Sequence, residues 1–115
     1  MLSNRARLAL TDIRDNIRLA EEFAAGLSVE ALKADRRAFY AVTRCLEIIS
    51  EAARRLPQSL RNCHPELPSR AIMGAGNVYR HDSDNVAEEI VWRTVQQNLA
   101  PLLAAIGGNR KRTLP

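Results

Sequence analysis

The stretch that decides the fold is DRRAFYAVTRCLEIISEAARRLP, residues 35 to 57. Its apolar residues recur in alternating steps of three and four, the period of one buried face of an α-helix; they are Phe39, Val42, Leu46, Ile49, Ala53 and Leu56. Asp35 can cap the first turn, and Pro57 cannot continue a helix. The stretch therefore predicts one long helix, from Asp35 to Leu56, with a narrow face that packs against another helix.

The preceding residues predict the partner of this helix. Residues 3–25 carry the same alternating spacing and are followed by Gly26, a residue type that commonly ends helices; the spaced residues are Leu10, Ile13, Ile17, Ala20 and Ala24. Ser28 can cap a short helical turn over residues 28–34. Two long helices with matching apolar faces and a short connection are expected to pack as an antiparallel pair.

The second half of the chain predicts two further helices. Residues 57–68 carry three prolines and are expected to form a loop, and residues 69–79 form a shorter helix that contains two glycines. After a turn, a last long helix ends at Gly107-Gly108, and Pro101 is expected to kink it or to end its first part. Its inward residues are Ile90, Val91, Val95, Leu99, Leu102 and Ile106. The fold class is therefore all-α, an up-and-down helical bundle of four to five helices.

Length and composition fit this class. A chain of 115 residues forms one domain, here a helical domain over residues 1–108 with a basic disordered tail, residues 109–115. Aromatic residues make up only 4% of the chain, as expected where aliphatic helices pack on helices. No run approaches the roughly 18 apolar residues of a membrane span, and the N-terminus lacks the apolar core of a signal peptide. We expect a cytoplasmic protein with no membrane partner.

The chain is basic, with a formal net charge of +4 and a pI near 9.7. Arginine outnumbers lysine, which suits phosphate contact because a guanidinium can grip two oxygens at once. Either a solvated helix surface or a nucleic-acid partner accounts for the charge. Cys45 is expected in the core. Cys63-His64 has no second ligand pair at zinc-site spacing, so we predict no metal and no cofactor.

Residues 74–85, GAGNVYRHDSDN, place Arg80 beside His81 and add two carboxylates. A histidine can transfer protons near neutral pH, and an arginine can stabilise charge that develops on a phosphate. Together they meet the minimum for metal-free RNA cleavage, in which a ribose 2′-hydroxyl attacks the adjacent phosphate. The alternative from spacing alone is a capping or salt-bridge cluster at a helix end.

Three stretches carry a family resemblance: SVEALKADRRAFYAVTRCLEIISEAARRL (28–56), HPELPSRAIMGAGNVYRHD (64–82) and VAEEIVWRTVQQNLAPLL (86–103). They resemble the HepT-like branch of the HEPN (higher eukaryote and prokaryote nucleotide-binding) superfamily. The resemblance implies a helical bundle that dimerises so that two RNase signatures face each other across one RNA-binding cleft. It also implies the toxin of a toxin–antitoxin pair, whose minimal nucleotidyltransferase antitoxin adenylylates the signature tyrosine.

The family signature is an arginine, four residues, a histidine, one residue and a tyrosine. His81 falls on the histidine, and Asn77 falls on the asparagine that follows the arginine in this family. Gly76 takes the place of the arginine and Ser83 that of the tyrosine. Arg80 adjoins the histidine and can supply a cation from another direction.

The leading hypothesis is a metal-independent ribonuclease toxin that acts as a homodimer on RNA, with tRNA and mRNA as candidate targets. Its catalytic residues are Arg80, as phosphate clamp, and His81, as general acid or base. The RNA- or phosphate-binding residues are Asn77, Tyr79 and Asp82, the candidate modification site is Ser83, and the supporting residue is Glu51. The alternative hypothesis is a catalytically inactive HEPN module that binds nucleic acid or a nucleotidyltransferase. For Glu51 the alternative is a surface salt bridge with Arg54 or Arg55.

Overall fold

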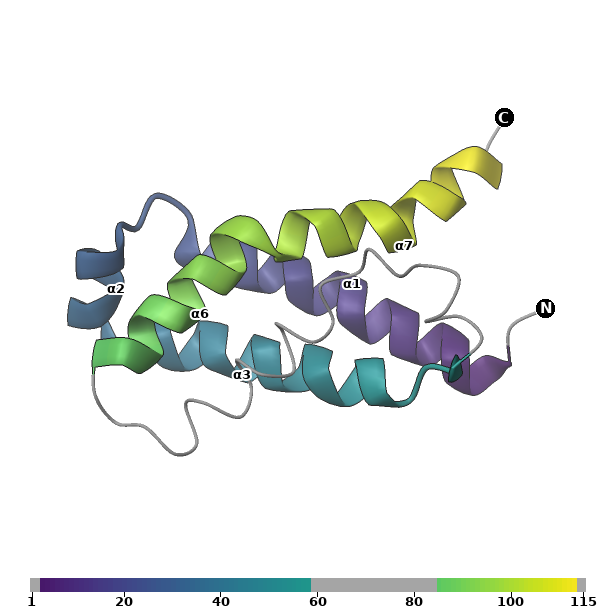
Figure 1. The fold of residues 1–115 in the computed structure, drawn as a ribbon, viewed down its shortest axis with the longest axis horizontal. Helices are drawn as coiled ribbons and strands as arrows, with labels where there is room; N and C mark the ends of the chain where they lie inside the picture. Colours follow the sequence, from purple (N-terminus) through teal and green to yellow (C-terminus); the bar gives the residue numbers. More distant parts are fainter. Residues whose placement is uncertain (1–2, 59–84, 114–115) are drawn as a thin grey trace.

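The fold is that of a computed structural model, which describes residues 3–58 and 85–113. Within these ranges all regular structure is helical (Figure 1). The helices are α1 (Asn4–Ala24), α2 (Val29–Ala34), α3 (Arg36–Arg54), α6 (Asn85–Gln97) and α7 (Leu99–Thr113). The prediction of an all-α bundle is confirmed, whereas the dimer stays a prediction. The predicted loop at 57–68 lies almost wholly outside the described residues, and the predicted helix at 69–79 lies outside them.

Helix α1 begins and ends within one residue of the predicted bounds, 3 and 25, and Ser3 caps it. The Ser3 hydroxyl accepts a hydrogen bond from the backbone N–H of Ala6 at 3.1 Å, which satisfies one of the free donors of the first turn. Beyond the other end, Gly26 adopts a φ of +75°, in the left-handed region that L side chains rarely occupy. The chain can therefore leave the helix axis within two residues and start α2.

The caps of α2 and α3 are also as predicted. The Ser28 hydroxyl accepts from the N–H of Ala31 at 3.1 Å, and the Asp35 carboxylate accepts from the N–H of Ala38 at 3.1 Å. Helix α3 ends at Arg54, two residues before the predicted end. Leu56 is nevertheless buried. Its N–H donates to the Ala53 carbonyl at 3.2 Å, and this hydrogen bond holds Leu56 against the last turn of α3.

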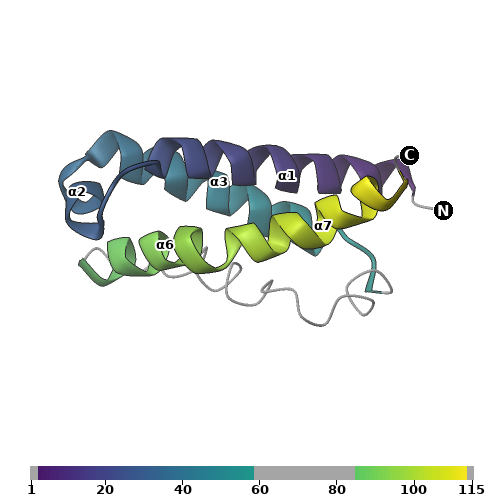
Figure 2. The ribbon, with the colours of Figure 1, turned by 90° about the horizontal axis from the view of Figure 1, so that it is seen from above.

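The core lies between α1 and α3, with α6 and α7 packed across them. Figure 1 and Figure 2 show α1 and α3 side by side and antiparallel, as their matching apolar spacings predict. The six predicted core residues of the α3 stretch are all buried. In α1 the buried face starts earlier than predicted, at Ala6 and Ala9, and Leu10 is only partly buried. The buried hydrophobic residues of the last helices are Val91, Val95, Leu99 and Leu102, and the other two residues that were predicted to face inward, Ile90 and Ile106, are partly buried.

The last long helix is divided near Pro101, as predicted. The N–H of Asn98 still bonds to the Thr94 carbonyl at 2.9 Å, and the N–H of Leu102 bonds to the Asn98 carbonyl at 3.2 Å. Proline has no N–H to offer the carbonyl four residues back, that of Gln97, and its ring crowds that oxygen. Helix α6 therefore ends at Gln97, and α7 begins at Leu99.

The predicted end of the last helix is wrong. Helix α7 continues through Gly107-Gly108 to Thr113, although the sequence predicts a stop at the glycines and a disordered tail beyond them. Each glycine lowers helix stability by about 1 kcal/mol relative to alanine, but both keep the N–H groups and carbonyls that a helix needs. The assignment of residues 109–115 to a tail outside the domain stays a prediction.

Two polar contacts join segments that are distant in the sequence. The indole N–H of Trp92 on α6 donates to the Leu27 carbonyl between α1 and α2 at 3.1 Å. On the opposite end of the bundle, Arg55 pairs with Asp12 of α1 at 2.9 Å. Among the helices that the structure describes, none combines the length and apolar character required to cross a bilayer.

Candidate functional site

Most of the predicted site lies outside the described residues. This holds for Asn77, Tyr79, Arg80, His81, Asp82 and Ser83. Glu51 is the predicted site residue that the structure places, on the last turns of α3. The site can therefore be built here from Glu51 and from the polar side chains of the described helices.

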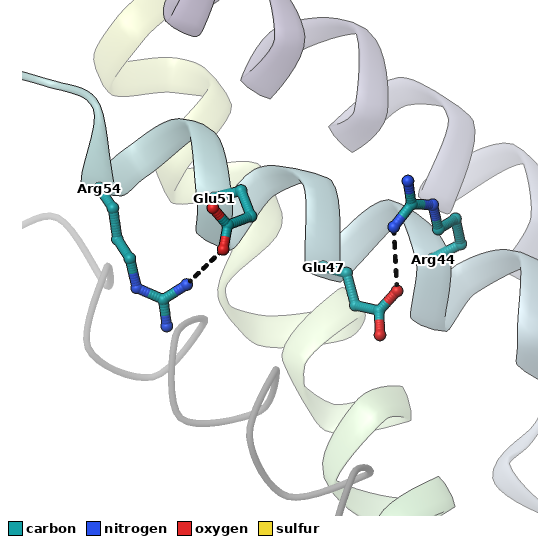
Figure 3. A network of polar contacts seen from close by, with 4 residues as sticks. All are labelled: Arg44, Glu47, Glu51 and Arg54. Atoms are coloured by element: carbon teal, nitrogen blue, oxygen red, sulfur yellow. Dashed lines mark hydrogen bonds and ion pairs between the residues drawn. The ribbon is translucent and has the colours of Figure 1, made fainter.

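Glu51 points outward from α3 and pairs with Arg54. Its carboxylate accepts from the Arg54 guanidinium at 3.1 Å, across one helical turn, with 64% of the Glu51 side chain exposed. Two turns earlier, Arg44 pairs with Glu47 at 3.3 Å, so the two ion pairs follow one another along the helix (Figure 3). Exposed pairs of this kind contribute at most about 0.5 kcal/mol each.

The structure therefore contains the salt bridge that was the alternative for Glu51. The Glu51 carboxylate can still bind another cation, because breaking an exposed ion pair such as the one with Arg54 costs little free energy. Its role as a support for Arg80 stays a prediction. The described part of the structure places no second cation on Glu51 besides Arg54.

A second polar cluster lies at the first turns of α3 and α6. Nη1 of Arg36 donates to Oε2 of Glu88 at 3.0 Å, and Nη2 donates to the Tyr40 hydroxyl at 3.4 Å. The guanidinium carbon also lies 5.1 Å from the centroid of the Phe39 ring and 5.1 Å from that of Tyr40. A cation at this range is attracted by the negative face of an aromatic ring. Three residues, Glu88, Tyr40 and Phe39, thus fix one guanidinium group.

The members of this cluster differ in burial. The Glu88 side chain is 7% exposed, whereas 54% of Arg36 remains open to solvent. Oε1 of Glu88 is buried and has no hydrogen-bond partner among the described residues. The hydrogen bonds with Tyr40 and then with Glu88 raise the pKa of the Arg36 guanidinium, which therefore carries its charge at any physiological pH.

A second ion pair lies at this end of the bundle. Lys33 of α2 donates to Glu89 of α6 at 2.9 Å. This hydrogen bond lowers the pKa of Glu89 below its ordinary value. The two carboxylates of the first turns of α6, Glu88 and Glu89, are thus each matched by a cation from another helix.

The comparisons with known proteins decide the family. The family model described as "Ribonuclease HepT-like" matches residues 13–107, which is most of the chain and includes α3, α6 and the residues between them. The chain belongs to this family. The resemblance inferred from the three sequence stretches is confirmed.

Curated relatives carry ribonuclease names. A protein of Thermococcus cleftensis named "Probable ribonuclease HepT" is 33% identical over 93 residues, which are 81% of this chain and 84% of the relative. Two proteins of Methanocaldococcus jannaschii, each named as a putative RNase, are 33% identical over 60 residues; these are 52% of this chain and 50% and 52% of the relatives. No solved structure matches the chain significantly.

Sequence reasoning missed the Arg36 cluster. Part of the signal was present, because Arg36 and Tyr40 stand four residues apart on a predicted helix and therefore share one face. Glu88 gave no signal, since it lies 52 residues from Arg36 in the chain. A glutamate in a first helical turn is ordinarily explained by the helix dipole alone, which hides its role as the buried partner of an arginine.

Proposed function

We propose that this HepT-like chain is a metal-independent endoribonuclease and the toxin of a toxin–antitoxin pair. It acts in the cytoplasm as a homodimer that holds RNA between two copies of residues 76–83. The family match over residues 13–107 carries the proposal, because it spans the segment with Arg80 and His81. The ribonuclease names of the curated relatives support the same class of reaction.

The proposed reaction needs one proton acceptor, one proton donor and one cation. His81 takes the proton of a ribose 2′-hydroxyl, and that oxygen attacks the adjacent phosphorus. Arg80 stabilises the negative charge of the phosphorane. The bond from phosphorus to the 5′-oxygen then breaks, and this oxygen takes a proton back from the protonated His81. The products are a 2′,3′-cyclic phosphate and a 5′-hydroxyl. Because His81 and Arg80 supply the proton transfer and the positive charge, the proposed reaction uses neither a metal ion nor a cofactor.

The remaining residues of the segment position the RNA and its catalyst. Asn77 and Tyr79 contact ribose and phosphate, and Asp82 orients the His81 ring. Glu51 supports Arg80 once its exposed pair with Arg54 opens. In this proposal a minimal nucleotidyltransferase neutralises the toxin, and Ser83 offers it a hydroxyl at the position of the family's tyrosine.

A second candidate function rests on two departures from the signature. Gly76 stands at the place of the family's arginine, and Ser83 stands at that of its tyrosine. A chain without these groups can keep the fold and bind RNA or a nucleotidyltransferase without cleaving RNA. If the protein is such an inactive module, it should bind RNA with an affinity that falls as the salt concentration rises, and it should form no cyclic-phosphate product.

One experiment separates the two candidates. The purified protein is incubated with total RNA or tRNA in EDTA, and the RNA ends are analysed for cyclic phosphate. His81→Ala should lower the cleavage rate by about 10²- to 10⁴-fold. The chain has two histidines, so His64→Ala serves as the matched control and should keep the wild-type rate. Binding without cleavage by the wild type would refute the ribonuclease and leave the inactive module.

A further inference from the structure

We propose that Arg36 and Tyr40 of α3 form a contact for single-stranded RNA outside the signature segment. In this contact an unpaired base stacks on the exposed Tyr40 ring, and the Arg36 guanidinium binds the neighbouring phosphate. The inference rests on the proposed function only in taking RNA as the ligand. It concerns residues that belong to no part of the family signature.

The first support is that the arginine is held in place before any ligand arrives. Glu88 and Tyr40 each accept one hydrogen bond from Arg36, and the rings of Phe39 and Tyr40 lie beside its guanidinium group. A guanidinium has five N–H donors, and the others have no partner among the described residues. A cation that is already oriented loses less side-chain entropy when it binds a phosphate.

The second support is the exposure of the two binding groups. Tyr40 is 63% exposed, the highest value among the large aromatic and aliphatic side chains described, together with Leu8. Phe39 meets the Tyr40 ring edge to face, with centroids 5.7 Å apart and an angle of 63°. This contact and Arg36 hold the ring in one orientation while much of its surface stays open. An exposed aromatic ring beside an arginine is the arrangement on which proteins stack unpaired bases.

The third support is the local balance of charge. Glu88 is buried and paired with Arg36, and Glu89 is paired with Lys33. Arg37 follows directly on α3, is exposed, and forms no ion pair with another described residue. Arg37, three residues before Tyr40 on α3, is therefore the cation here that no described carboxylate neutralises, whereas Arg36 and Lys33 share their charges with Glu88 and Glu89.

Binding can be measured separately from cleavage. A short fluorescent RNA with 2′-O-methyl riboses keeps its bases and phosphates but lacks the attacking hydroxyl. Fluorescence anisotropy with this RNA then reports affinity even if the protein is a nuclease. A second oligomer of equal length with abasic sites keeps the phosphates and removes the stacking partners.

Tyr40→Ala should weaken binding of the complete RNA by about 5- to 150-fold and hardly affect the abasic RNA. Arg36→Gln, made together with Glu88→Gln so that no buried charge is left alone, should lower the salt slope by about 0.7 on both oligomers. Phe23→Ala and Arg18→Gln on α1 are the matched controls, an exposed aromatic and an exposed arginine, and should bind as the wild type does. Circular dichroism confirms that each variant is folded.

The outcomes distinguish this contact from the ribonuclease itself. If the wild type cleaves unmodified RNA and Tyr40→Ala binds the 2′-O-methyl RNA as tightly as the wild type, the contact is refuted and the proposed function stands. If the wild type binds but does not cleave, the ribonuclease fails while the contact is still judged by its variants. A wild type that binds no RNA refutes both. A change of molar mass in Tyr40→Ala at unchanged RNA affinity would identify a protein interface instead and overturn the proposal.

Discussion

Replacing Leu46 with alanine tests the central packing of the fold. Leu46 lies in the middle of the α3 apolar face and is 0% exposed. The change removes three carbon atoms, which at about 0.8 kcal/mol each amounts to about 2.4 kcal/mol of lost burial. The cavity that remains adds to this loss, so we expect a decrease of about 2.7 to 5 kcal/mol in the free energy of unfolding.

Leu8→Ala is the matched control for this change. Leu8 lies on α1 and is 63% exposed, so the same atoms are removed from a largely solvated position. The expected decrease is below about 1 kcal/mol. Both residues are in helices, and the difference in helix propensity between leucine and alanine therefore cancels between the two variants.

Urea unfolding followed by far-ultraviolet circular dichroism measures both variants. The midpoint should fall for Leu46→Ala while the slope with urea stays constant, because the same surface is exposed on unfolding. Measurements at a low and a high protein concentration separate any contribution from a partner subunit. The placement of α3 would be refuted if both variants lost equal stability at each concentration, or if Leu46→Ala lost less than Leu8→Ala.

Three further expectations follow from single residues. Gly26→Ala should lower the free energy of unfolding by about 1 kcal/mol, because the φ of +75° strains an L side chain even though the space beside it is open; an equal or higher urea midpoint would contradict this. In a Cys63→Ser background, Ellman's reagent should react with Cys45 only as the protein unfolds, since burial raises the pKa of this thiol; rapid labelling of the native protein would contradict its burial. Lys33 lowers the pKa of Glu89 below 4.5, so their pair stabilises the fold above that pH and the contribution disappears as the pH falls through the folded-state pKa. The difference in urea midpoint between wild type and Glu89→Gln should therefore shrink from pH 7 to pH 3, and a constant difference would exclude the pair as its cause.

Local signals in the sequence were sufficient for the first three helices. The caps at Ser28 and Asp35 and the stop at Gly26 act within one turn of their own position, so each could be predicted without knowing the rest of the fold. Proline acts equally locally, which is why the division of the last helix near Pro101 was also predictable. The spacing of the apolar residues then identified which faces of α1 and α3 would meet.

Where local signals compete, the sequence alone did not determine where the last helix ends or which residues of α1 are buried. Gly107-Gly108 lowers helix propensity without removing any hydrogen-bonding group, and α7 continues through both glycines. In the same way Leu10 fits the α1 spacing as well as Ala9 does, but only the position of the neighbouring helices determines that Ala9 is buried and Leu10 partly exposed.

The sequence by itself determined the helical class, the caps, the paired apolar faces and the family. It also identified Arg80 and His81 as the residues with the chemistry for RNA cleavage, a role that stays a prediction. Only the tertiary structure brought Glu88 of α6 to Arg36 of α3, across 52 residues of chain. The physical reason is that a cap or a helical face depends on neighbours within a few residues, whereas a buried ion pair between helices exists only after the helices have packed.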